Sequence, residues 1–108
     1  MNFKVESISL FDKQAKRLAK KYPSLKYELV TLINALSADP LMGKSMGNGF
    51  YKIRIAIGSK GKGKSGGGRI ITFVKIREEF VFLTSIYDKS DKASISEKEL
   101  EEVFKLIP

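Results

Sequence analysis

The sequence contains no cysteine and no histidine among its 108 residues. Without cysteine there is neither a disulfide nor a thiolate metal site. Without histidine the chain lacks the commonest general base near neutral pH and the commonest metal ligand. Acid–base chemistry would therefore have to come from lysine, carboxylate or tyrosine side chains, and we expect no metal and no small-molecule cofactor.

Long apolar runs are also missing. No stretch approaches the roughly 20 residues that a membrane helix needs, and residues 1–6 do not have the layout of a signal peptide. The length predicts a single domain over residues 1–108. We expect a cytoplasmic protein that does not bind a membrane.

Acidic residues are absent from the middle third of the chain. No Asp or Glu occurs between Pro40 and Arg77, although the formal net charge of the whole chain is +8. The basic residues of this interval are Lys44, Lys52, Arg54, Lys60, Lys62, Lys64, Arg69, Lys75 and Arg77. Such asymmetry predicts a polyanionic partner, most often nucleic acid. The alternative is a solvated face that only keeps the protein soluble.

Hydrophobic periodicity predicts an α+β fold with the element order β-α-α-β-β-β-α. We expect an antiparallel sheet with a helical hairpin packed on one face and a C-terminal helix. The expected strands cover residues 3–8, 51–57, 70–76 and 80–87, a loop covers 41–49, and the helices start near residues 9, 24 and 96. The centre of the two central apolar strands, 70–76 and 80–87, should be covered on both faces or lie near a partner.

Two pairs of residues have the spacing of a capping box at a helix start. Ser9 with Asp12 would open the first helix, and Ser96 with Glu99 the last. Pro23 should end the first helix at Tyr22, because proline disfavours a helical residue before it.

The stretch from Phe50 to Arg69 carries the strongest functional signal. Apolar side chains alternate with Lys52 and Arg54, so these two cations should project together from one face of a strand. A glycine-rich loop with lysines at 60, 62 and 64 follows, and Arg69 opens the next strand. We interpret this stretch as a cationic surface that faces phosphate, with the loop as a mobile clamp.

The segment Gly58 to Ser65 also fits the phosphate-binding-loop pattern G-x-x-x-x-G-K-[ST]. That motif requires a helix directly after the loop, since the helix N-terminus holds the phosphates. Here three glycines and a β-branched run follow, which favour a strand. The sequence therefore argues against an ATPase.

Two segments resemble the RelE/HigB-type toxins of bacterial toxin–antitoxin modules, in the RelE/ParE superfamily. They are Gly63-Lys64-Ser65-Gly66-Gly67-Gly68-Arg69 and the run from Tyr87 to Ser96, Tyr-Asp-Lys-Ser-Asp-Lys-Ala-Ser-Ile-Ser. The strand Tyr51-Lys52-Ile53-Arg54-Ile55 and the order of elements extend the resemblance to nearly the whole chain.

The resemblance implies a ribosome-dependent endoribonuclease that cuts messenger RNA through the ribose 2′-hydroxyl, without metal. It also implies neutralisation by a cognate antitoxin of the helix-turn-helix type. Carried onto this sequence, the catalytic residues would be Lys52, Arg54, Arg69 and Lys89. The chain departs from many members in having Ser90 after the last strand and no tyrosine after Tyr87.

The residue chemistry fits this reaction, which needs proton removal, charge stabilisation and a proton for the leaving oxygen. Arginine can grip two phosphate oxygens, so Arg69 suits charge stabilisation. Lys52 is a candidate base, because neighbouring cations disfavour the charged form of a lysine. Both Lys52 and Arg54 could instead only bind phosphate. Further RNA-binding candidates are Lys60, Lys62, Lys64, Lys75, Lys92 and Tyr87.

Two other functions stay open at this point. One is inhibition of DNA gyrase, as in the ParE branch of the superfamily. The other is a non-enzymatic, basic nucleic-acid-binding module. All three functions predict association that weakens with salt, so salt dependence alone does not separate them.

Overall fold

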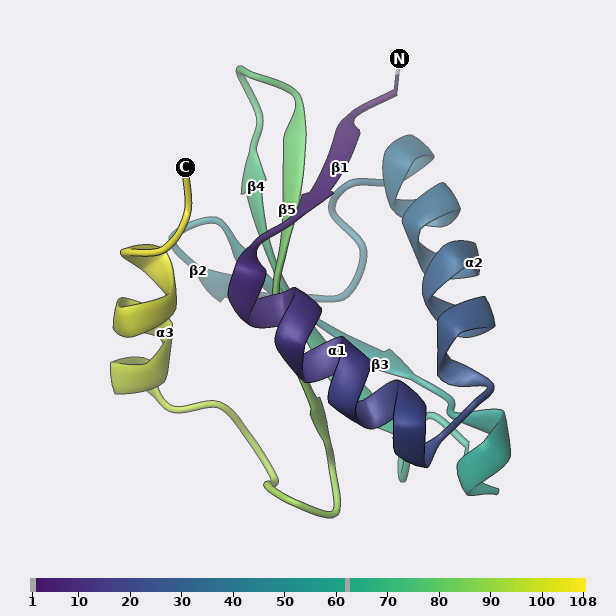
Figure 1. Cartoon of the computed structure of the whole chain (residues 1–108). Helices are drawn as coiled ribbons and strands as arrows, with labels where there is room; N and C mark the ends of the chain where they lie inside the picture. The colour runs from purple at the N-terminus through teal and green to yellow at the C-terminus, as the bar shows by residue number, and fades with distance from the viewer. Residues whose placement is uncertain (1, 62) are drawn as a thin grey trace.

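The computed structural model describes residues 2–61 and 63–108 and shows a twisted five-stranded sheet flanked by helices (Figure 1). The elements in chain order are β1 (Lys4–Ser7), α1 (Ser9–Lys21), α2 (Leu25–Ala38), β2 (Lys44–Gly47), β3 (Phe50–Ile55), the 3-10 turn η1 (Gly58–Lys60), β4 (Gly68–Lys75), β5 (Phe80–Asp88) and α3 (Glu97–Phe104). The predicted α+β class and the order of the predicted elements are confirmed.

The sheet is mixed, which corrects the prediction of an antiparallel sheet. Its strand order is β1-β5-β4-β3-β2, and β1 runs parallel to β5, with Lys4 opposite Phe80. The other neighbours are antiparallel. Tight turns force antiparallel pairing, but β1 and β5 are joined through most of the chain, so local sequence does not set their direction.

A fifth strand, β2, lies in the segment predicted as a loop. It pairs with β3 through the two-residue turn Asn48-Gly49, where φ is 55° and 88°. Both values lie in the left-handed region that a two-residue hairpin turn needs, and Asn-Gly is the dipeptide that favours it. The expected loop is therefore partly an edge hairpin.

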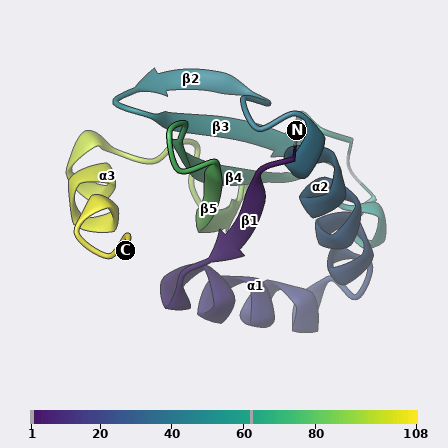
Figure 2. The same cartoon turned by 90° about the horizontal axis from the view of Figure 1, so that it is seen from above.

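Apolar side chains fill two cores, one on each face of the sheet. The larger core lies beneath α1 and α2 and includes the fully buried Leu25, Leu36 and Ile70. The smaller core lies beneath α3 and contains Ile71 and Val103. α2 and α3 accordingly lie on opposite sides of β4 and β5 (Figures 1 and 2). The prediction that both faces of the central strands are covered is confirmed.

The helix ends follow the sequence signals in part. α1 ends before the Tyr22-Pro23 step, and Ser96 with Glu99 forms the predicted capping box. The capping box predicted for Ser9 is wrong, because Ile8 is the N-cap residue of α1 and makes no side-chain cap. Asp12 instead accepts a hydrogen bond from the hydroxyl of Ser7 at 2.5 Å.

A strand, not a helix, follows the glycine-rich loop, as the sequence predicts. β4 begins at Gly68 and pairs with β3 and β5. The loop therefore lacks the helix that a nucleotide-binding loop needs. Within residues 2–61 and 63–108, no helix is both long and apolar enough to cross a membrane.

Candidate functional site

Three neighbouring strands bring basic side chains together on one face of the sheet. Lys52 and Arg54 lie two residues apart on β3, so both point away from the core beneath α1 and α2. Lys44 of β2 lies directly opposite Lys52, and Arg69 of β4 lies directly opposite Arg54. Like charges in directly opposed positions destabilise a sheet. This arrangement therefore lowers stability unless an anion binds there.

These side chains line a groove of about 620 Å³, which we call the basic groove. Its ionisable lining residues are Lys44, Lys52, Arg54, Lys64, Arg69 and Lys89. No carboxylate of the described residues lines the groove. β4 lies between β3 and β5, so Arg69 stands between the β3 cations on one side and Lys89, just after β5, on the other. The predicted catalytic residues Lys52, Arg54, Arg69 and Lys89 are thus brought together.

Arg69 is the most deeply placed of these cations, with 5% of the residue exposed. Its Nη1 donates to the carbonyl oxygens of Lys64 at 2.8 Å and Gly68 at 3.0 Å, and Nη2 donates to that of Ser65 at 3.3 Å. A guanidinium has five N–H donors. Among the described residues, the N–H of Nε and one of Nη2 have no partner. Two N–H donors of the guanidinium therefore remain for oxygens of a phosphate.

The loop before β4 is held to the body of the protein at its base. The N–H of Gly58 donates to the carboxylate of Glu28 at 2.7 Å. The N–H of Ser59 donates to the hydroxyl of Ser24 at 2.9 Å. A Cβ on Gly67 would collide with the carbonyl oxygen of Ile55, so only glycine fits where the loop returns to the sheet.

Lys60 has a different place from the one predicted for it. Its ammonium forms an ion pair with Asp88 and donates to the hydroxyl of Ser90 at 3.0 Å and the carbonyl of Gly66 at 2.8 Å. An ammonium has three N–H donors, so these partners use them all. Lys60 is therefore held inside the protein and is not free to bind phosphate.

Asp88 is the centre of this buried cluster, with 1% of the residue exposed. Burial raises the pKa of its carboxyl group, but hydrogen bonds from Lys60, Ser90 and Tyr22 outweigh that effect. The net result is a pKa well below the usual range of an aspartate. Asp88 therefore stays charged and paired at neutral pH.

Lys92 and Tyr87 lie beside each other, outside the lining of the basic groove. Lys92 forms an ion pair with Glu99, and its ammonium stands 5.0 Å from the centre of the Tyr87 ring. The hydrogen bond from Lys92 is the main cause of a lowered pKa for Glu99. Burial raises the pKa of Tyr87, whose hydroxyl has no partner among the described residues. Tyr87 therefore packs in the smaller core and stays protonated near neutral pH.

Lys75, another predicted phosphate ligand, lies outside the basic groove. Lys75 lies six residues beyond Arg69 on β4, about 20 Å along the strand, and donates to the carbonyl oxygen of Pro108 at 2.6 Å. Lys62 lies outside the described residues. Of the predicted phosphate-binding lysines that the structure describes, Lys64 is the one that lines the groove.

Lys44 is the groove residue that the sequence prediction did not single out as a ligand. The sequence predicts a loop at this position, and only the pairing of β2 with β3 places Lys44 opposite Lys52. The Asn48-Gly49 turn was the available signal, because it predicts a hairpin that folds residues 44–47 back onto β3.

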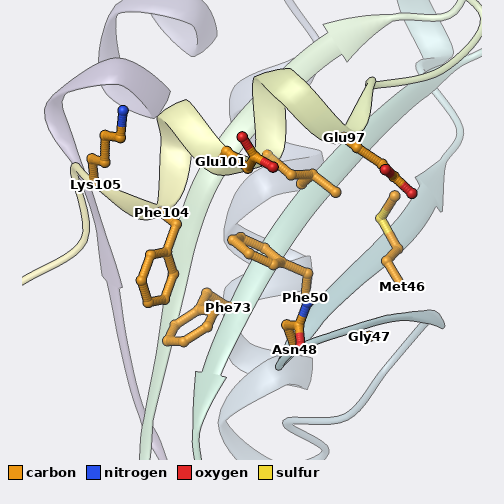
Figure 3. A pocket seen from close by; sticks show the side chains of 10 residues that line it. Met46, Gly47, Asn48, Phe50, Phe73, Glu97, Glu101, Phe104 and Lys105 are labelled. Carbon is orange, nitrogen blue, oxygen red and sulfur yellow. The ribbon is translucent and has the colours of Figure 1, made fainter.

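A second hollow, of about 880 Å³, separates the β2–β3 hairpin from α3 (Figure 3). The rings of Phe50, Phe73 and Phe104 form an apolar part of this hollow. The ring centres of Phe50 and Phe73 are 5.1 Å apart, and those of Phe73 and Phe104 are 5.6 Å apart. Glu97 and Glu101 stand at its edge (Figure 3). Apolar rings and carboxylates do not suit a polyanion, so the basic groove is the better candidate for nucleic acid.

Fold and groove together define a small α+β protein that presents a cationic surface on one face of its sheet. The family model for the RelE toxin of the RelE/RelB toxin–antitoxin system matches residues 9–107. This chain belongs to the RelE toxin family. It is therefore the toxin of a toxin–antitoxin module, and its family implies an antitoxin partner.

A solved structure has the same fold. It is an arginine-to-alanine double mutant of the Escherichia coli toxin RelE in the free state. The two structures align over 100% of both chains with a TM-score of 0.67, at 18% sequence identity. No curated protein sequence matches the chain significantly.

Proposed function

We propose that this RelE-family toxin is a ribosome-dependent endoribonuclease that cleaves messenger RNA and so arrests translation and growth. One observation carries the proposal: like charges oppose each other across the sheet, Lys44 against Lys52 and Arg54 against Arg69, and share one groove without acids. Their mutual repulsion lowers stability, and a bound RNA backbone would relieve it. The resemblance to RelE/HigB-type toxins supports RNA as the anion.

The proposed chemistry is attack of a ribose 2′-oxygen on the adjacent phosphorus, with loss of the 5′-oxygen. The 2′-hydroxyl loses its proton, the leaving oxygen gains one, and a 2′,3′-cyclic phosphate and a 5′-hydroxyl result. The two remaining N–H donors of Arg69 would hold phosphate oxygens and stabilise the charge that develops on them. Lys44 and Arg54 would hold the neighbouring phosphates.

Lysines on the two sides of Arg69 are the candidates for proton transfer. Lys52 lies on β3 and Lys89 follows β5, with β4 between them. The attacking and leaving oxygens of a phosphoryl transfer stand on opposite sides of the phosphorus. We assign proton removal to one of these lysines and proton donation to the other, since both line the groove.

The partners in this proposal are the ribosome, which presents the messenger RNA, and a cognate antitoxin of the helix-turn-helix type. The proposal predicts that induction of the toxin produces cuts inside translated codons, read by primer extension on a defined transcript. Intact transcripts during growth arrest would rule out this activity. DNA damage together with intact transcripts would indicate a gyrase inhibitor instead.

A further inference from the structure

The loop that leads into β4 is held in place through its backbone carbonyls. All five carbonyl oxygens of residues 64–68 accept a hydrogen bond. Arg69 donates to the carbonyls of Lys64 at 2.8 Å, Ser65 at 3.3 Å and Gly68 at 3.0 Å. The Nζ of Lys60 donates to the carbonyl of Gly66 at 2.8 Å, and the backbone N–H of Lys89 donates to that of Gly67 at 3.1 Å. The loop is therefore held between two cations, the largely buried Lys60 and the buried Arg69.

Lys60 is in turn fixed by Asp88 and Ser90 and, through Asp88, by the end of α1. Asp88, at the end of β5, forms its ion pair, and Ser90, in the loop after β5, accepts a further hydrogen bond at 3.0 Å. The other carboxylate oxygen of Asp88 accepts from the hydroxyl of Tyr22, at the end of α1, at 2.8 Å. The side chain of Asp88 is fully buried and that of Lys60 is 11% exposed. We call Tyr22, Lys60, Asp88 and Ser90 the anchor cluster.

Residues 66–68 are three consecutive glycines, which have the greatest backbone freedom of any residue type. They have no side chains with which to fix their own conformation. The anchor cluster fixes the conformation of this glycine segment, because the ammonium of Lys60 donates a hydrogen bond to the Gly66 carbonyl. The neighbouring carbonyls of Lys64 and Ser65 are then placed to hold Arg69.

We infer that Lys60 and Asp88 are positioning residues for Arg69. They fix the peptide group of Gly66, and with it the neighbouring carbonyls of Lys64 and Ser65, which hold the guanidinium of Arg69 at the basic groove. The orientation of Arg69 stands independently of what the groove binds, whereas the effect on RNA cleavage rests on the proposed function. Lys60, which the sequence predicts to bind phosphate, thus acts on the basic groove indirectly, through the position of Arg69.

The test uses the double variant Lys60→Met/Asp88→Asn, which removes both buried charges together and leaves an amide that can still bond to Tyr22 and Ser90. The ¹⁵N-detected Nε–H resonance of Arg69 reports its order without RNA. We expect this resonance to be sharp in the wild type and averaged or lost through exchange in the variant. In a ribosome-dependent cleavage assay, kcat should fall by about 10²-fold, as for other misplaced catalytic groups, with KM little changed.

The matched control is Lys105→Met/Glu102→Gln, which removes an exposed lysine–carboxylate pair at 3.4 Å. It should change neither the Arg69 resonance nor kcat. A second comparison adds Arg69→Ala to the anchor variant. Because Lys60 and Asp88 act through Arg69, the triple variant should be no slower than Arg69→Ala alone.

An unchanged Arg69 resonance in the anchor variant overturns the inference, and so do rate losses that add to those of Arg69→Ala. If the wild type cleaves no RNA, the proposed function fails and the resonance still decides the inference. If the anchor variant does not fold, Ser90→Ala replaces it, because it removes one hydrogen bond from each charged partner, at 3.0 and 2.7 Å. An unperturbed Arg69 in folded Ser90→Ala would then overturn the inference.

Discussion

Replacement of Asp88 by asparagine tests how far the buried ion pair contributes to stability. The substitution keeps the size of the side chain but leaves the ammonium of Lys60 buried without a counter-charge. Breaking one partner of a buried pair destabilises a protein by about 3–5 kcal/mol. At about 4 °C per kcal/mol for a chain of this size, the melting temperature should fall by about 12–20 °C. Urea unfolding at pH 7, followed by circular dichroism, measures the free energy directly.

The double variant Lys60→Met/Asp88→Asn serves as the internal control, because neither charge then remains buried. It should recover most of the stability that Asp88→Asn loses. A loss below about 0.5 kcal/mol in Asp88→Asn would refute the reasoning, since that is the range of surface substitutions. Failure of the double variant to recover any stability would show that the unpaired charge is not the cause.

The lowered pKa of Asp88 adds a pH dependence with a definite sign. A carboxyl group with a lowered pKa in the folded state stabilises the protein above its unfolded value, about 3.9, and loses that contribution as the pH falls through the folded value. The difference in the free energy of unfolding between the wild type and Asp88→Asn should therefore have its full size at pH 7 and become smaller below about pH 4. A difference that widens on acidification would contradict the charge state assigned to Asp88.

Three further predictions concern the basic groove and the fold. Arg69→Ala should lower the cleavage rate by about 10²–10³-fold. Arg69→Lys should restore little of the lost rate, because an ammonium lacks the two-donor edge of a guanidinium. Equal activity of Arg69→Lys and wild type would contradict this role. Lys44→Ala should reduce the slope of log affinity against log salt for single-stranded RNA by about 0.7, whereas Lys75→Ala should leave it unchanged. Ser96→Ala should destabilise the protein by about 0.5–2 kcal/mol through loss of the α3 cap, measured by thermal unfolding.

Local patterns predicted most of the elements correctly because their causes are local. The alternation around Lys52 and Arg54 set which face of β3 they occupy, and Pro23 set the end of α1. The first capping box failed because Ile8, not Ser9, is the N-cap residue of α1, and Asp12 accepts a hydrogen bond from Ser7. Spacing alone does not decide between two such partners when both lie within reach.

The amino-acid sequence by itself determined the RelE-like α+β architecture, the acid-free interval and the placement of Lys52, Arg54 and Arg69 on adjacent strands. These follow from hydrophobic period and charge, which act over a few residues. Only the tertiary structure decided that β1 runs parallel to β5, that Lys44 joins the basic groove and that Lys60 turns inward to Asp88. Each of these depends on a contact between segments that are distant in the sequence. The sequence does not distinguish the lysines of a glycine-rich loop from one another, because the ion pair of Lys60 with the buried carboxylate of Asp88 forms only in the folded protein.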